Sequence, residues 1–135
     1  MRFALAISLL AVLLNASGSL AQDESSRTWR LFQFEKLSKE RRDLSRPYLG
    51  FLKADALHAG LYVLPKGGAD KQGPHKEDEV YYVIKGSAVF ESGGEEKEVM
   101  PGSIIYVKAG APHHFKDISE TLELLVFFSS WRESE

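Results

Sequence analysis

From Tyr48 onward the chain is a succession of short apolar segments separated by turns that contain glycine or proline, and this pattern constrains the fold most strongly. The expected strands are residues 51–52, 57–64, 80–84, 88–91, 95–99, 104–107, 113–116 and 122–128. Short β-branched and aromatic runs between such turns are typical of an all-β sandwich or barrel. The last segment is apolar throughout, as in a strand that is buried on both faces.

The residues before the strands predict a short helix. Residues 35–44 carry Leu37 and Leu44 on either side of a charged run, which gives a narrow apolar stripe on a solvated helix. Pro47 is expected to stop this helix. Residues 29–34 alternate loosely and are interpreted either as a first edge strand or as an N-terminal arm.

The N-terminus has the three parts of a secretory signal peptide. Arg2 supplies a positive charge, and residues 3–14 form an apolar stretch that is too short to span a membrane. Ser19 and Ala21 are small residues at the two positions that a signal peptidase reads. We therefore expect cleavage after Ala21 and a secreted or periplasmic protein that has no membrane span after cleavage.

Composition places the chain among soluble globular proteins. Its 135 residues, 44% hydrophobic and 27% charged, fit one folded domain. With a net charge of -2 and no basic block among aromatic residues, a nucleic-acid partner is not expected. The absence of cysteine excludes disulfides, thiolate zinc sites, iron–sulfur clusters and a cysteine nucleophile. The expected organisation is a signal peptide (1–21), an arm with a helix (22–47) and a barrel (48–131).

Three side chains from two separated segments are candidates for a metal site. His75 and Glu79 stand four residues apart at the start of an expected strand, and His113 begins a later one. Two imidazoles and one carboxylate that converge can hold a divalent ion and leave coordination positions open. Without cysteine, any ion must be held by nitrogen and oxygen donors.

Strand alternation predicts which neighbours share the cavity with these ligands. If Glu79 points at a metal, Tyr81 and Val83 line the same cavity, and Glu77 has the same parity. Phe115 shares the face of His113. His114 must then point the other way, and we interpret it as a bystander.

Two sequence motifs carry a family resemblance. The segment Gly73–Gly86, GPHKEDEVYYVIKG, places His75, Glu79 and Gly86 at the spacing of the second histidine, the glutamate and the glycine of the first cupin motif. Gly73 stands where that motif has its first histidine. In PGSIIYVKAGAPHHFKD, residues 101–117, the second motif is matched at its glycine and histidine positions, with Lys108 in place of proline and Asp117 in place of asparagine.

The chain therefore resembles a single-domain cupin over residues 57–128. The resemblance implies an all-β fold, a double-stranded β-helix or jelly-roll barrel, here with a short N-terminal helix. It implies His75, Glu79 and His113 as ligands of a divalent metal, with iron, manganese, zinc, nickel and copper all compatible. One of the usual four ligands is missing, and Gln72 or Glu77 could take its place. A homodimer is also implied.

The sequence leaves the function open between three readings. The first is a metal-dependent dioxygenase, isomerase or lyase that acts on a small organic substrate, with Tyr81 and Phe115 as pocket walls and Glu77 or Asp117 as an orienting or proton-accepting group. The second is a non-catalytic barrel that binds a metal or a small metabolite, which Gly73 favours. The third is an interaction module that pairs two copies through a face formed by Val80, Tyr82 and Ile84.

Overall fold

The computed structural model describes residues 27–130, so the expected signal peptide and its cleavage site lie outside the described residues. The chain divides into two units, Met1–Leu31 and Phe32–Glu135. Residues 27–31, the described part of the first unit, contain no helix or strand. Among the described residues, no helix has the length and apolarity needed to cross a membrane.

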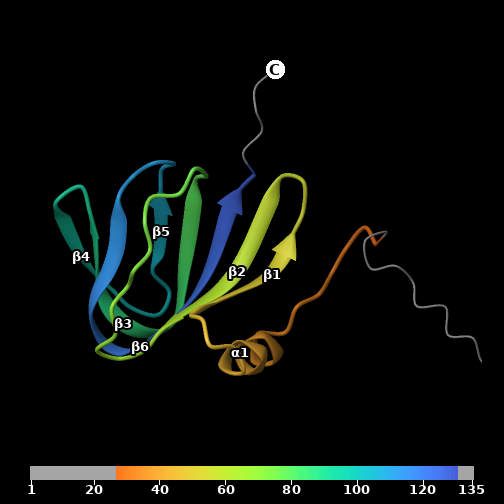
Figure 1. Cartoon of the computed structure of the whole chain (residues 1–135), viewed down its shortest axis with the longest axis horizontal. Helices are drawn as coiled ribbons and strands as arrows, with labels where there is room; N and C mark the ends of the chain where they lie inside the picture. Colours follow the sequence, from red (N-terminus) through yellow and green to blue (C-terminus); the bar gives the residue numbers. More distant parts are fainter. Residues whose placement is uncertain (1–26, 131–135) are drawn as a thin grey trace, which may run out of the picture. The chain divides into compact units, whose positions relative to one another are not determined.

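The second unit is dominated by antiparallel strands, which confirms the expected all-β class with a short N-terminal helix (Figure 1). Its described elements are α1 (Phe34–Arg42), β1 (Tyr48–Lys53), β2 (Leu57–Leu64), β3 (Glu79–Ser92), β4 (Glu95–Val99), β5 (Ile104–Val107) and β6 (His113–Ser129). The strand order is β1-β2-β6-β3-β4, and β5 pairs with β3. The long strands β3 and β6 therefore form the centre of the sheet.

The N-terminal helix is shorter than the sequence pattern predicts. It ends at Arg42. The N–H groups of Asp43 and Leu44 donate hydrogen bonds to the carbonyl oxygens of Glu40 and Arg41, three residues earlier, and this tighter 3₁₀-type pattern ends the α-helix. Leu37 is buried, as expected. The edge-strand interpretation of residues 29–34 is wrong, since residues 29–33 pair with no described strand and Phe34 already belongs to α1.

Two pairs of expected strands are single continuous strands. Residues 80–84 and 88–91 both lie in β3, and residues 113–116 and 122–128 both lie in β6. The interruptions read from the sequence are bulges, at which the register of the β3–β6 pair shifts around Lys85 and Ser87. A bulge bends a strand without ending it, so turn-forming residues do not break the pairing.

Gly86 and Asp117 adopt left-handed backbone conformations at this bent part of the β3–β6 pair. Gly86 has φ 85°, and a Cβ atom at this position would overlap the carbonyl oxygen of Thr121 on β6. Asp117 is the only described non-glycine residue with positive φ, at 48°. Only glycine allows the strands to approach this closely with such a backbone.

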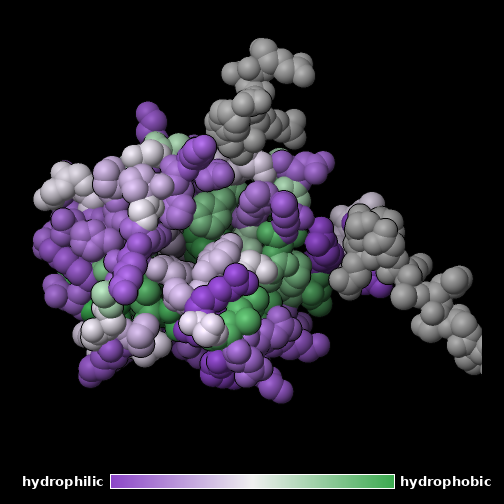
Figure 2. All heavy atoms as spheres, in the orientation of Figure 1, coloured by the Kyte–Doolittle hydropathy of each residue, from purple (hydrophilic) through white to green (hydrophobic). Residues whose placement is uncertain are grey.

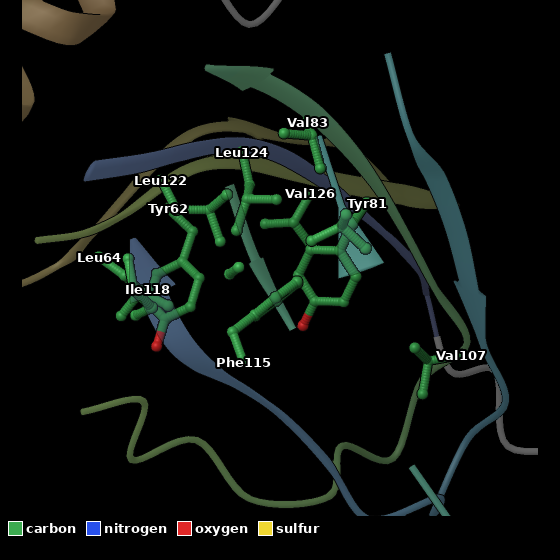
Figure 3. Packing of buried hydrophobic residues seen from close by; sticks show 12 residues of the cluster. Tyr62, Leu64, Tyr81, Val83, Val107, Phe115, Ile118, Leu122, Leu124 and Val126 are labelled. Atoms are coloured by element: carbon green, nitrogen blue, oxygen red, sulfur yellow. The ribbon is translucent and has the colours of Figure 1, made fainter. Parts of the chain in front are cut away.

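The hydrophobic core lies on the concave side of the sheet. Inward side chains from β2, β3 and β6 pack together (Figure 3), among them Leu64, Val83, Leu122 and Leu124, which are almost fully buried. On the face seen in Figure 2, hydrophobic residues reach the surface in the middle of the unit and are surrounded by hydrophilic ones. The core thus continues toward an opening of the sheet.

We predict that Gly86→Ala lowers the free energy of unfolding by about 2–4 kcal/mol. Alanine is disfavoured at the positive φ of this position, and its Cβ atom would overlap the backbone of Thr121. Chemical denaturation measures this change. The matched control is Gly94→Ala, since Gly94 has φ 80° but its Cβ would meet no atom within 4 Å. A loss in Gly86→Ala no larger than that in Gly94→Ala would contradict the close approach at Gly86.

Candidate metal centre

The three predicted ligands meet at one point of the structure. The Nε2 atom of His75 lies 3.4 Å from Oε1 of Glu79, and Nε2 of His113 lies 3.3 Å from Oε2 of Glu79. Among the described residues these three offer donor atoms that all lie within 4.8 Å of one another. Such spacing suits a single ion placed between them.

The curvature of the β3–β6 pair brings these residues together. Glu79 is the first residue of β3 and pairs with Phe128 near the end of β6. His113 is the first residue of β6 and pairs with Ser92, the last residue of β3. In a flat ribbon, Glu79 and Ser92 would be roughly 40 Å apart at the usual rise per strand residue. The contact between Glu79 and His113 therefore requires the sheet to roll up along its length.

Glu79 is the most unusual group of the cluster. Its side chain is 1% exposed, and neither carboxylate oxygen has a hydrogen-bond partner among the described residues. A buried carboxylate without partners is strongly destabilising unless a cation or a proton compensates it. The two orphaned oxygens, each facing a histidine nitrogen, are what a bound divalent ion would satisfy.

The ring of His113 is oriented by the backbone. Its Nδ1 donates to the carbonyl oxygen of Ala111 at 2.8 Å, which leaves Nε2 with a free lone pair toward Glu79. Metal-binding histidines commonly carry this second hydrogen bond, because it fixes the tautomer and the ring plane. The side chain is fully buried, so this nitrogen can only serve groups inside the cluster.

The segment that carries His75 is held by hydrogen bonds to the turn before β6. The N–H of Gly110 donates to the carbonyl oxygen of His75 at 2.7 Å, and the N–H of Ala109 donates to Oδ1 of Asp78 at 2.8 Å. The two histidine-containing segments are thus tied to each other directly. The His75 side chain is 34% exposed, so the centre is reachable from solvent on that side.

Gln72 and Tyr81 extend the cluster. The Gln72 Oε1 atom lies 3.5 Å from Nε2 of His75 and accepts a hydrogen bond from the Tyr81 hydroxyl at 2.8 Å. That hydroxyl also lies 3.1 Å from Nε2 of His113. Burial raises the pKa of Tyr81 far above its ordinary value, and the neighbouring Glu79 carboxylate raises it further, so the phenol stays protonated.

A cavity of about 370 Å³ adjoins the cluster. Of the residues predicted to face a pocket, Gln72, Glu77 and Tyr81 line it, whereas Val83 and Phe115 pack in the core beneath. The cavity is also lined by residues that were not among the predicted pocket residues: Tyr48, His58, Tyr62, Val126 and Phe128. The cavity is mainly aromatic with a few polar groups, as small-molecule sites usually are.

Some of these lining residues could not be predicted from the sequence, because pairing between strands brings them to the cavity. His58 and Phe128 are cross-strand partners on β2 and β6, so they reach the cavity mouth together although they are 70 positions apart. The ring of Tyr48 occupies the space that a Cβ atom of Gly60 would fill. Tyr48 on β1 pairs with Tyr62, two residues from Gly60 on β2. This contact between strands was not readable from local sequence.

His114 and Asp117 lie away from the centre. His114 points to the face of β6 opposite His113, where its Nε2 atom lies 3.8 Å from Oε2 of Glu91 on β3, in agreement with its interpretation as a bystander. Asp117 is exposed and borders a separate depression with Ser87 and Ser119. Its position in the second motif is therefore explained by the left-handed backbone at the bend and not by contact with the cluster.

Comparison with known proteins agrees with this geometry. The sequence profile of the cupin domain matches residues 60–128. An uncharacterized protein of Streptomyces coelicolor is 43% identical over 100 residues, which are 74% of this chain and 95% of that protein. These matches confirm the resemblance inferred from the two motifs.

Solved structures share the fold. The crystal structure of TT1209 from Thermus thermophilus superposes with a TM-score of 0.61 at 27% identity, covering 73% of this chain and 95% of that one. KdgF from a Halomonas species superposes with a TM-score of 0.57 at 20% identity, covering 64% and 79%. An RmlC-like cupin from Shewanella frigidimarina, at 22% identity and a TM-score of 0.55, supports the jelly-roll architecture.

We predict that His113 in the metal-free protein titrates above the ordinary histidine pKa. Burial lowers this pKa, but the adjacent Glu79 carboxylate and the hydrogen bond to the Ala111 carbonyl together outweigh burial and raise it. His113 should therefore stabilise the fold fully below about pH 6.5, the usual value, and this contribution should vanish as pH rises through the raised pKa. Histidine NMR titration of metal-free protein measures the midpoint; in Glu79→Gln it should fall, and an unchanged midpoint would contradict the assignment.

Proposed function

The chain belongs to the cupin family, and we propose that it is an exported cupin that binds a divalent metal through His75, Glu79 and His113 and acts on a small organic substrate in the adjoining cavity. The observation that carries the proposal is the buried Glu79 carboxylate, whose two oxygens lack partners and each face a histidine nitrogen. The donor set is chemically suited to iron, manganese, zinc, nickel or copper.

A bound ion would supply Lewis-acid chemistry or coordinate an oxygen-containing ligand at its open positions. The chain's own residues supply the rest. The aromatic lining of the cavity favours the apolar part of a substrate, and the protonated Tyr81 hydroxyl can donate a hydrogen bond at the edge of the cluster. The 34% exposure of His75 supports ligand access from that side. Dioxygenase, isomerase and lyase reactions are all compatible with this arrangement.

We predict that purified protein contains about one divalent ion per chain, measured by elemental analysis, and that His75→Ala and His113→Ala each weaken metal binding by more than about 100-fold. Loss of a ligand should cost more than the 10–100-fold typical of an outer-shell residue. The matched control is His114→Ala, which removes the neighbouring imidazole on the opposite face and should leave metal content unchanged. Wild-type protein that binds no divalent metal would contradict the proposal.

The alternative function is a non-catalytic barrel that sequesters a metal or a small metabolite. Gly73 favours it, because the residue at the position of the first motif histidine offers no side chain. The two functions separate with metal-loaded protein and a pool of small organic compounds. Substrate conversion or dioxygen uptake that is lost in His113→Ala supports the enzyme, and retention of an unchanged bound compound supports the barrel.

Export and a homodimer are further parts of the proposal. Export rests on the signal-like N-terminus, and the dimer is supported by family resemblance and by an apolar surface formed by Val80, Tyr82, Ile104 and Tyr106, which are all exposed. These four residues are cross-strand neighbours on β3 and β5. Because β5 pairs only with β3 among the described strands, its other edge is free to meet a second copy.

We predict that the protein elutes as a dimer in size-exclusion chromatography with light scattering, and that Ile104→Lys shifts it to a monomer. A charge placed in the centre of an apolar interface is costly because it loses its hydration. Glu98→Lys, on exposed β4, serves as the control and should remain dimeric. A monomeric wild type would rule out this interface while leaving the metal centre unaffected.

A further inference from the structure

We propose that Gln72 is the fourth donor of the metal centre and that Asp70 fixes its side-chain amide so that the carbonyl oxygen faces the ion. This inference rests on the proposed function, because it requires an ion held by His75, Glu79 and His113. It concerns two residues that lie outside both histidine-containing motifs. Two residues, Gln72 and Glu77, are candidates for the missing ligand from the sequence, and the hydrogen bonds around Gln72 favour it.

The position of the Gln72 carbonyl oxygen is the first argument. Oε1 lies 3.5 Å from Nε2 of His75, close to the 3.4 Å that separates the same nitrogen from Glu79. The Tyr81 hydroxyl, which donates to this oxygen at 2.8 Å, is itself 3.1 Å from Nε2 of His113. The oxygen therefore lies beside the other donor atoms, and an amide oxygen is an acceptable ligand for hard and borderline divalent ions.

The orientation of the amide is the second argument. Side-chain amides are often ambiguous, because their oxygen and nitrogen atoms look alike. Here the other amide atom lies 2.6 Å from Oδ2 of Asp70. An ionised carboxylate only accepts hydrogen bonds, so the atom facing Asp70 must be the NH2 group. The oxygen of Gln72 is consequently the atom that faces His75.

Asp70 is held firmly enough to impose this orientation. Its Oδ1 accepts from the Tyr62 hydroxyl at 2.6 Å and from the N–H of Gln72 at 3.1 Å. Its Oδ2 accepts from the Gln72 NH2 group and from the N–H of Phe115 at 2.9 Å. All four partners are donors, so each carboxylate oxygen serves two of them. With an asparagine at this position, one of the two oxygens would be replaced by an NH2 group, which would face two other donors and could accept a hydrogen bond from neither.

Glu77 fits the fourth position less well. Its side chain lines the cavity, but it is not part of the group of imidazole and carboxylate donors that lie within 4.8 Å of one another in the described chain. The charge balance also differs. With a neutral Gln72, two neutral histidines and one glutamate, a divalent ion keeps a net charge of +1, which strengthens its attraction for an oxygen of a ligand.

The test compares Co²⁺ binding and the visible absorption of Co²⁺-loaded protein in wild type, Gln72→Met, Asp70→Asn and Glu77→Gln. Methionine keeps the length of the side chain and removes the oxygen donor. We expect Gln72→Met, which removes a ligand, to weaken Co²⁺ binding by more than about 100-fold, and Asp70→Asn to weaken it by about the 10–100-fold of an outer-shell residue. Both variants should change the absorption, which reports the number and kind of donors. Glu77→Gln should bind Co²⁺ as wild type does.

The outcomes separate this inference from the proposed function. If wild type binds Co²⁺ through His75 and His113 but Gln72→Met binds it within about twofold of wild type, a factor too small for a lost donor, the fourth-donor inference fails and the three-ligand site stands. If Glu77→Gln causes the loss instead, Glu77 is the donor. If wild type binds no Co²⁺, both ideas fail.

The orientation by Asp70 has a readout that needs no metal and no stable variant. In the NMR spectrum of metal-free wild type, the side-chain NH2 group of Gln72 should exchange with solvent more slowly than that of the exposed Gln33. Equal exchange rates would show that the bond to Asp70 does not form. Metal-free thermal unfolding of Gln72→Met then distinguishes loss of the donor from loss of the fold.

Discussion

The contact of Gly86 with the Thr121 backbone is the constraint on which the rest of the structure depends. It lets β3 and β6 stay paired from Glu79↔Phe128 to Ser92↔His113 while the ribbon bends through its bulges. A straight ribbon would leave Glu79 and His113 at opposite ends. The bend turns two residues that are remote along the sheet into neighbours, and the same curvature encloses the core and opens the cavity beside it.

The metal centre is built at a cost to the metal-free fold. Glu79 is almost completely buried with two unpartnered oxygens, and such a group lowers stability because it has lost its hydration. In metal-free protein, the Glu79 carboxylate and the Ala111 carbonyl both favour the protonated form of His113, which raises its pKa. A bound cation would offset the cost of the buried carboxylate and would stabilise the folded state by mass action. The buried, unpartnered carboxylate that weakens the metal-free fold is thus also the group that would attract a cation most strongly.

Much of this architecture was readable from the sequence because it follows from local patterns. The all-β class, the bounds of β2, β4 and β5 and the convergence of His75, Glu79 and His113 come from strand periodicity and motif spacing. The continuity of β3 and β6 could not be predicted from the sequence. The pair Lys85-Gly86, for example, is interpreted as a turn unless the partner strand is known. The lining by Tyr48 and His58 likewise depends on pairing between β1, β2 and β6, which leaves no local signal.

The departure from the first cupin motif at Gly73 shows how a sequence position and a spatial position can differ. Gly73 is exposed, and a Cβ atom there would contact nothing within 4 Å. Its neighbour Gln72 instead reaches the cluster, because Asp70 draws the Gln72 NH2 group away and leaves its oxygen beside His75. Reading the motif position by position predicts a missing ligand, whereas the hydrogen-bond network places a candidate oxygen donor one residue earlier. A change of ligand type at such a site needs a second residue that orients the new side chain, and in this chain Asp70 has the bonds to do so.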